Sequence, residues 1–170
     1  MGGLSAVLIL SDQDNFGVDF DNYEFDLDIN NSTLKVENIS FSLPFNLTNV
    51  GYFELENLQI GVDLVLNYSH IDGGGPGINE TRIVKILEMT QDFGDIDPYG
   101  GSLSSSLEGY NSSFLHDNFP DPITEIDWFR TPPTLIFYAN ITISLDYSLG
   151  MHSLSITALD IEVGNYTRPF

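Results

Sequence analysis

The sequence predicts a mainly β protein: an antiparallel β-sandwich of about seven strands with one short helix. Several stretches alternate apolar and polar residues with a period of two, as strands buried on one face do. Between them lie clusters of Gly, Pro, Asn and Asp that favour turns. Of the 170 residues, 42% are hydrophobic, so one domain with a sizeable core is expected.

The first half of the chain contains three such stretches. Residues 23–29 alternate aromatic and aliphatic residues with acids, and residues 38–48 alternate large apolar residues with Asn, Ser and Thr. Within the second stretch Pro44 has the outward parity and lacks an N–H group, which predicts a sheet edge or a bulge there. Residues 58–67 form the third stretch, with aliphatic residues on the inner parity.

The second half begins with a loop and ends with two strands. Residues 70–81, HIDGGGPGINET, have the composition of a loop, and residues 82–89 predict a strand after it. The two closing strands are predicted over residues 135–147 and 154–163. The alternation in the last strand slips in phase near Ala158.

A short amphipathic helix is predicted over residues 102–116. Apolar side chains recur there at three- and four-residue spacing, although Gly109 weakens the pattern. The residues that define this spacing are Leu103, Leu107, Tyr110 and Phe114.

The charge and the absence of cysteine exclude several classes of partner and site. The chain has 25 acidic and 5 basic residues, a net charge of −20, whereas nucleic acid and anionic lipid are bound by clustered Lys and Arg. With no cysteine, disulfides and thiolate metal sites cannot form. The sequence predicts no nucleic-acid partner and no small-molecule substrate.

The chain is rich in acceptor tripeptides for N-linked glycans. Nine N-x-S/T sequons occur, where about two would be expected by chance from 14 Asn and 26 Ser plus Thr. The sequons of Asn30 and Asn31 overlap, so only one of these two asparagines is expected to carry a glycan, and the prediction names Asn31. The predicted glycosylation sites are Asn31, Asn38, Asn46, Asn67, Asn79, Asn111, Asn140 and Asn165.

Four of these asparagines fall on the polar phase of predicted strands: Asn38, Asn46, Asn67 and Asn140. A glycan is bulky and solvated, so it is tolerated only on an exposed face. The sequons therefore predict an exported glycoprotein with sugars on the outer faces of the sandwich. The alternative is that Asn, Ser and Thr are simply abundant in a turn-rich β protein.

The segment LPFNLTNVGYFELENLQIGVDLVL, residues 43–66, resembles the late-embryogenesis-abundant type 2 family, also called the water-stress and hypersensitive-response domain. In that family a strand ends in an Asn-Pro-like turn and another strand follows; here Asn49-Val50-Gly51 stands in place of Asn-Pro. The resemblance covers residues 20–163 and implies a seven-stranded sandwich with one helix. It also implies a non-catalytic domain that is often tethered to a membrane.

One acidic segment is a candidate calcium site. Asp12, Asp14 and Asp19, with Gly17 between them, match the D-x-D-x-x-G start of calcium loops, in which oxygen ligands at alternate positions surround the cation. The match is partial, because Phe16 occupies a ligand position. The alternative is a solvated acidic turn. No other cofactor is expected.

No catalytic signature occurs in the sequence. The three histidines are isolated from one another, and there is no G-x-S-x-G motif, P-loop or dinucleotide-binding motif. The acids offer many carboxylate pairs but no indication of a pair in an apolar cleft, which an acid–base catalyst would need. The sequence therefore predicts that the protein is not an enzyme.

The N-terminal residues are a candidate self-assembly segment. The side chains of this arm are apolar on both parities, as expected of a strand covered on both faces; they are Leu4, Val7, Leu8, Ile9 and Leu10. Residues 1–16 are thus interpreted as an arm with an acidic hinge, and residues 17–170 as the sandwich. The arm is predicted to insert as a donor strand into a neighbouring copy. A strand folded back into its own sandwich and the stub of a membrane anchor are the alternatives.

Together these features predict a secreted, N-glycosylated structural protein at the cell surface, a filament or envelope subunit whose partners are copies of itself. A calcium-dependent or carbohydrate-binding adhesion module and a membrane-tethered stress-protective domain are the alternative functions.

Overall fold

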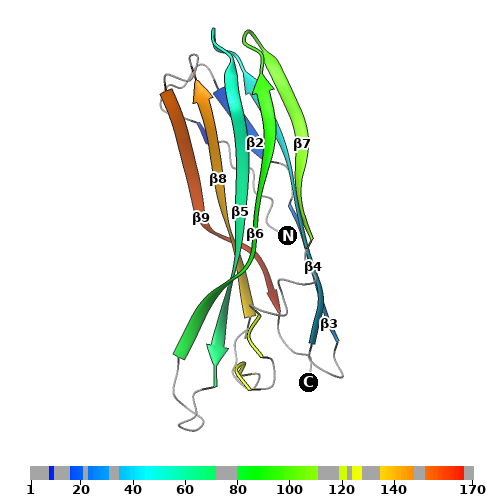
Figure 1. The fold of residues 1–170 in the computed structure, drawn as a ribbon. Coiled ribbons are helices and arrows are strands. Elements are labelled where there is room, and N and C mark those ends of the chain that lie inside the picture. The colour runs from blue at the N-terminus through cyan, green and yellow to red at the C-terminus, as the bar shows by residue number, and fades with distance from the viewer. Residues whose placement is uncertain are drawn as a thin grey trace.

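The computed structural model describes residues 8–9, 16–20, 23–30, 35–71, 80–110, 119–121, 124–127, 135–147 and 152–166. These residues form almost only strands, arranged as two antiparallel sheets that pack face to face (Figure 1). The predicted β-sandwich is therefore confirmed. None of the described residues forms a helix long and apolar enough to cross a bilayer.

The first sheet, sheet A, is built around one long central strand. β4 (Lys35–Asn49) pairs with β7 (Gly101–Tyr110) along one side and with β2 (Phe16–Phe20) and β3 (Glu24–Asn30) along the other. β2 and β3 lie end to end, and β1 (Leu8–Ile9) pairs with β2. All of these pairings are antiparallel.

Pro44 lies where the pairing of β4 changes from β3 to β2. β3 pairs with β4 as far as Ser42, and β2 pairs from Phe45 onward, so Leu43 and Pro44 fall at the interruption between the two partners. The pairing of β4 with β7 runs through Pro44 without a register shift, so the predicted bulge is absent, and the predicted edge is present only as this gap on one side of β4.

The second sheet, sheet B, has the strand order β6-β5-β8-β9. β5 (Leu55–His70) pairs with β6 (Glu80–Ile96) and with β8 (Leu135–Tyr147), and β9 (His152–Tyr166) pairs with β8. The phase slip near Ala158 is a bulge, because Asn140 of β8 faces two residues of β9, one of which, Asp160, has a φ of 58°.

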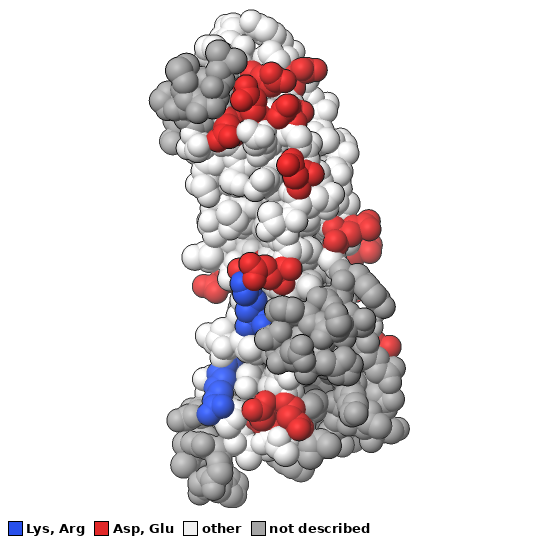
Figure 2. Space-filling model, viewed as in Figure 1, with Lys and Arg blue, Asp and Glu red and all other residues white. Residues whose placement is uncertain are grey.

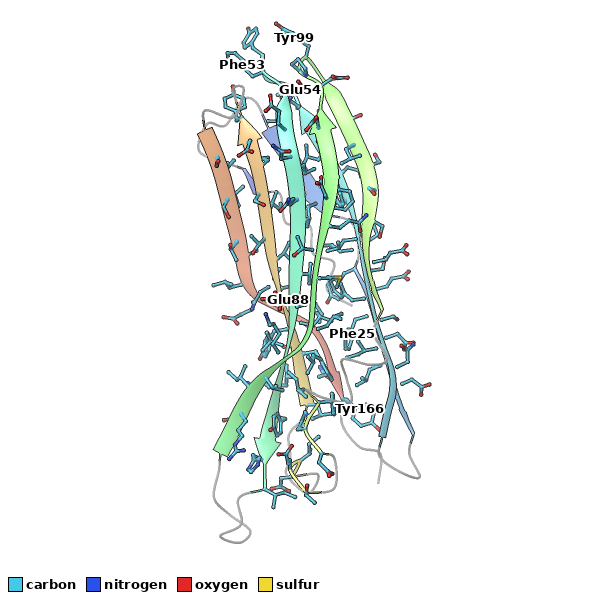
Figure 3. All side chains as sticks on the ribbon, in the orientation of Figure 1. Phe25, Phe53, Glu54, Glu88, Tyr99 and Tyr166 are labelled. Carbon is cyan, nitrogen blue, oxygen red and sulfur yellow. The ribbon has the colours of Figure 1, made fainter. Side chains whose placement is uncertain are left out.

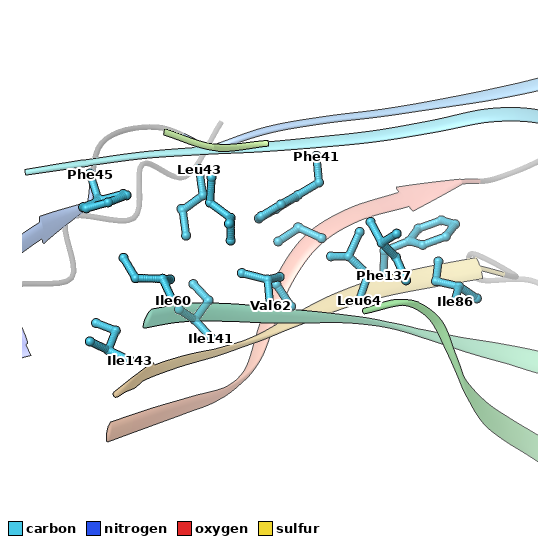
Figure 4. Close-up of a cluster of buried hydrophobic side chains, with 14 of the residues drawn as sticks. Phe41, Leu43, Phe45, Ile60, Val62, Leu64, Ile86, Phe137, Ile141 and Ile143 are labelled. Atoms are coloured by element: carbon cyan, nitrogen blue, oxygen red, sulfur yellow. The ribbon is translucent and has the colours of Figure 1, made fainter. Parts of the chain in front are cut away.

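The core lies between the sheets and is formed by the apolar parity of each strand (Figure 4). Ile39, Phe41, Leu43, Phe45 and Leu47 of β4 are all at most 2% exposed, as the alternation predicts. The inner parities of β5 and β8 face them across the sandwich and are also buried. Burying a side chain of this size contributes roughly 1.5–3 kcal/mol, so these three strands account for much of the stability.

The prediction of a helix over residues 102–116 is wrong for residues 102–110, which form most of β7. Residues 111–116 lie outside the described residues. The inner parity of β7 runs through Leu103, Ser105, Leu107 and Gly109. Because the small residues Ser105 and Gly109 do not count as apolar, only the four-residue spacing of the two leucines is visible in the sequence. The open side of β4 supplies hydrogen-bond partners for the whole segment, and this tertiary pairing decides in favour of a strand.

Close contacts join the sheets along both edges. Along one edge, the ring of Phe25 in β3 packs 4.9 Å from that of Phe137 and against Gly164, while the hydroxyl of Tyr23 donates to the carbonyl of Glu162 over 3.2 Å (Figure 3). Along the other edge the backbone of Gly109 faces the side chain of Met89, and a Cβ at this position would meet the Met89 sulfur.

Candidate functional site

The sequon asparagines in the described part of the chain lie outside the core. Asn46 and Asn165 are exposed, and Asn38, Asn67 and Asn140 are half-buried on the outer faces of their sheets. Asn30 ends β3. Asn31, Asn79 and Asn111 lie outside the described residues. The predicted outward placement of the four strand sequons is confirmed.

The side-chain amides of these asparagines have different surroundings. The Oδ1 atoms of Asn38 and Asn67 are buried without a hydrogen-bond partner. Asn140 Oδ1 accepts from the N–H of Asp160 over 2.8 Å, which leaves the Nδ2 atom, where a glycan attaches, outside that bond. Asn165 Nδ2 donates to the exposed Glu162 carboxylate over 3.2 Å.

The acidic segment predicted to bind calcium is described only in part. Asp19 lies in β2 and pairs with Asn46 of β4, whereas Asp12 and Asp14 lie outside the described residues. Among the residues that the structure does describe, no group of three His, Asp or Glu side chains is arranged to hold a metal ion. The calcium site stays a prediction.

The predicted self-assembly segment is also described in part. Leu8 and Ile9 form β1 and pair antiparallel with Val18 and Gly17 of the same chain. For these two residues the structure has the folded-back arrangement. Leu4, Val7 and Leu10 lie outside the described residues.

At one end of the sandwich, two chain links meet around Asn49. The first, residues 50–54, joins β4 to β5, and the second, residues 97–100, joins β6 to β7. Asn49 is fully buried; its Nδ2 donates to the carbonyls of Phe53 and Ile96 over 2.8 and 3.1 Å, and its Oδ1 accepts from the N–H of Gly51 over 3.0 Å. One side chain thus joins β4, the first link and the end of β6.

Backbone hydrogen bonds hold the two links together. The N–H of Tyr99 donates to the carbonyl of Gly51 over 2.9 Å, and that of Gly100 donates to the carbonyl of Asn49 over 2.7 Å. Tyr99 has a φ of 62°, a left-handed conformation that is strained for a bulky residue. Such strain persists where the surrounding bonds over-determine the backbone, as they do here.

This frame presents apolar side chains to solvent, and we call the set of Val50, Tyr52, Phe53 and Tyr99 the aromatic tip (Figure 3). Tyr52 is 72% and Tyr99 74% exposed, and their rings meet edge to face with centroids 5.7 Å apart. Phe53 makes a similar edge-to-face contact with Tyr147 at 5.5 Å. Glu54 and Asp97 flank the aromatic tip in sequence and are exposed.

The aromatic tip was not predicted from the sequence. The available signal was the presence of aromatic residues inside two turn segments, NVGYFE and DPYGG, where composition alone predicts only loops. The two segments meet because β4 pairs with β7 in sheet A while β5 pairs with β6 in sheet B, so the β4–β5 link and the β6–β7 link lie at the same end of the sandwich.

A shallow polar hollow of about 310 Å³ lies on sheet B across β5, β8 and β9. Its wall includes Asp146, whose carboxylate accepts from the Ser153 hydroxyl over 2.7 Å and from Asn57 Nδ2 over 3.0 Å. These bonds, that of Ser153 first, lower the pKa of Asp146. A lowered pKa keeps the carboxylate ionised, the opposite of what a general acid needs.

Two further polar side chains, Tyr68 and His70, lie near the end of β5. Burial, together with the nearby Glu125 carboxylate, raises the pKa of Tyr68, so its phenol stays protonated at neutral pH. His70 lies beside Ile126 in an isolated bridge, and its Nδ1 is buried without a partner. Among the residues that Figure 2 colours, acidic side chains are spread over the visible face, and basic ones lie in its middle and lower part.

No protein-family model matches the chain, and no curated protein matches it in sequence.

Proposed function

We propose that this chain is a non-catalytic, N-glycosylated structural protein of the cell surface. The observation that carries the proposal is the placement of the sequons. Asn38, Asn46, Asn67, Asn140 and Asn165 all lie on outer faces or strand edges, although they sit in four different strands of two sheets.

Asn49 provides the contrast that supports this argument. Among the described asparagines it is fully buried and has all three of its bonds satisfied within the protein, and it is followed by Val-Gly rather than by x-Ser/Thr. The asparagine that makes three hydrogen bonds inside the fold thus lies outside a sequon, whereas Asn46 and Asn165 are exposed and Asn38, Asn67 and Asn140 are half-buried on outer faces.

Site-resolved mass spectrometry of glycopeptides from the native protein tests the proposal. Most of the nine sequons are expected to carry glycan, with one of Asn30 and Asn31 occupied. Occupancy at fewer than three sites would contradict an exported glycoprotein.

Assembly into a filament is the more specific form of the proposal. Within the described residues, β1 is held to its own β2 by two residue pairs, and six residues of the sequence, 10–15, separate the two strands. The same antiparallel pairing made with β2 of a neighbouring copy would be a head-to-tail exchange, which propagates unless it closes into a ring. A short connection between the exchanged strand and its domain favours this kind of exchange.

Deletion of residues 1–10 tests this assembly. The intact protein is expected to form filaments in electron micrographs, and the truncated protein to stay monomeric in light scattering. The double variant Leu8→Asp, Ile9→Asp is the matched control of full length, and it is also expected to be monomeric. Filaments formed by the truncated protein would show that assembly does not use the arm.

The aromatic tip favours a second candidate function, binding of a neutral saccharide. Exposed Tyr52 and Tyr99 rings offer apolar faces for the C–H groups of a sugar, and the carboxylates of Glu54 and Asp97 can accept hydrogen bonds from hydroxyl groups. An anionic polysaccharide would be repelled by the net charge of −20.

A glycan array measured with and without a calcium chelator tests this second function. Replacement of the two tip tyrosines, Tyr52→Ala with Tyr99→Asn, is expected to weaken binding at least about tenfold, equivalent to roughly 1.4 kcal/mol. Asn is chosen at 99 because it tolerates a positive φ. Ile71→Ala, an exposed apolar residue outside the tip, is the control and should leave binding unchanged.

A further inference from the structure

The outer face of sheet B contains an exposed apolar surface that the core does not use. We call it the apolar strip, and it consists of Val65, Ile83, Ile136, Tyr138 and Leu159. Ile83 is 71% and Leu159 65% exposed, and the other three side chains are half-buried. Outward positions of a solvated sheet are normally polar. They are polar in the half of sheet B nearer the aromatic tip, where Thr142 pairs with Thr157 and Ser144 with Ser155.

The register of sheet B places two sequon asparagines within this strip. In one row across the sheet, Ile83 of β6 faces Asn67 of β5, Ile136 of β8 follows, and Asn165 of β9 ends the row. Adjacent strands are about 4.8 Å apart, so isoleucine and sequon asparagine alternate at that spacing.

A third sequon borders the strip on the side nearer the aromatic tip. Asn140 lies two residues along β8 from Tyr138, on the same face, and the bulge of β9 opposite it contains Leu159. Three of the five described sequon side chains are therefore grouped around one apolar surface.

We propose that the N-linked glycans of Asn67, Asn140 and Asn165 lie along sheet B and cover the apolar strip. The inference rests on the proposed function, because it requires these sequons to be occupied. The C–H faces of the first sugars would pack on the isoleucine side chains and on the Tyr138 ring, with the hydroxyl edges of the sugars turned to water. The glycans would then complete the fold on this face.

A second copy of the chain fits the strip less well than a glycan does. A stable protein interface needs roughly 800 Å² from each partner, far more than five side chains in two rows supply. The strip is bordered by the charged side chains of Lys85, Glu88 and Glu162, and two copies would each bring a net charge of −20.

The outer face of sheet A provides an internal control. Asn46 is exposed there and pairs with Ser104 of β7, which has Ser102 and Ser106 on either side, so among the described side chains of β7 its glycan would meet a polar surface. Removing that glycan changes the mass and the solubility of the protein in the same way as removing the glycan of Asn67, but it uncovers no apolar side chain.

The experiment compares glycosylated protein that lacks the sugars at 67 and 165 with protein that lacks the sugar at 46. The single variants Asn67→Gln and Asn165→Gln are each compared with Asn46→Gln, so that every comparison removes one glycan, and the double variant Asn67→Gln with Asn165→Gln shows whether the two effects add. Asn67 Oδ1 is buried, so replacing Asn67 could alter stability even without loss of a glycan. The variant Ser69→Ala with Thr167→Ala therefore serves as a second test, because it removes both sequons and keeps both asparagines. Occupancy is measured by mass spectrometry, exposed apolar surface by the fluorescence of the dye ANS, and stability by Tm.

We expect loss of the glycans at 67 and 165 to raise ANS fluorescence at least about twofold and to lower Tm by about 2–6 °C, with little change for Asn46→Gln. Equal effects of the sheet A and sheet B variants, with the sites shown to be occupied, would overturn the inference and leave the proposed function intact. Unoccupied Asn67 and Asn165 would overturn it as well, and occupancy at the other sequons would then decide the proposed function separately. A dimer of the fully glycosylated protein that Ile83→Ser disrupts would show that a second copy covers the strip, and would also overturn it.

Discussion

Replacing Asn49 with alanine tests how far the aromatic tip depends on one buried side chain. The substitution removes the hydrogen bonds to the carbonyls of Phe53 and Ile96 and from the N–H of Gly51. The groups on Ile96 and Gly51 are buried, whereas the bond to Phe53 is part-buried and its carbonyl can be reached by water.

The expected loss follows from these partners. A buried donor or acceptor left without a partner lowers the free energy of unfolding by about 1–3 kcal/mol, so two such groups give roughly 2–6 kcal/mol. This is a large part of the about 5–15 kcal/mol that stabilises a typical domain. At this chain length it corresponds to a fall in Tm of roughly 5–20 °C.

Urea unfolding followed by circular dichroism measures the loss. Asn49→Asp keeps the shape but replaces the donor with a second oxygen facing two carbonyls, and at neutral pH it should lose at least as much stability as Asn49→Ala. Asn57→Gly is the matched control: the bond from Asn57 to Asp146 is exposed, and the φ of 54° at this position suits glycine, so the change should stay within about 1 kcal/mol. A loss of less than about 1 kcal/mol for Asn49→Ala would refute the reasoning.

Three further predictions concern the sheet contacts and the polar hollow. Gly109→Val should lower the free energy of unfolding by about 1–3 kcal/mol, because the added atoms meet the side chain of Met89. The double variant Gly109→Val with Met89→Ala should recover part of this lost stability in urea unfolding. No recovery would contradict the contact between these two residues. Gly164→Ala should give a loss of similar size, since its Cβ would lie 2.8 Å from a ring carbon of the phenylalanine in β3; an unchanged urea midpoint would argue against this close packing. The pKa of Asp146 is lowered, so an NMR titration should place it below the ordinary 3.8, and Ser153→Ala should move it upward. Because the folded state favours the carboxylate, Asp146 stabilises the fold fully at a pH above its pKa in the unfolded chain. This stabilisation is lost as the pH falls through the lower pKa that Asp146 has in the folded protein.

The strands of the core were predictable because their alternation is long and strong. β4, β5 and β8 each place a large apolar residue at nearly every inner position, and a period of two over ten or more residues has no competing interpretation. The phase slip near Ala158 was likewise visible as a break in that period, and it is the bulge opposite Asn140.

β7 was not predictable, because its inner positions include Ser105 and Gly109. These two positions are small for a reason that lies elsewhere in the chain: Gly109 faces the Met89 side chain of β6. The residue pattern of one strand cannot show that a small residue leaves room for a side chain from a distant strand. The side of β4 that pairs with β7 supplies the hydrogen bonds of β7, and the sequence of β7 alone gives no sign of this partner.

The candidate sites divide in the same way. The abundance of sequons and the outward parity of Asn38, Asn46, Asn67 and Asn140 are properties of single strands, and alternation determines which face each side chain takes. By itself, then, the sequence determined the mainly β class, the core strands and the outward parity of these four sequon asparagines. The row in which Asn67 and Asn165 alternate with Ile83 and Ile136, and the meeting of two links at Asn49, were decided only by the tertiary structure. They depend on the register between strands far apart in the chain, which is set by hydrogen bonding and packing of the whole sheet rather than by any local pattern.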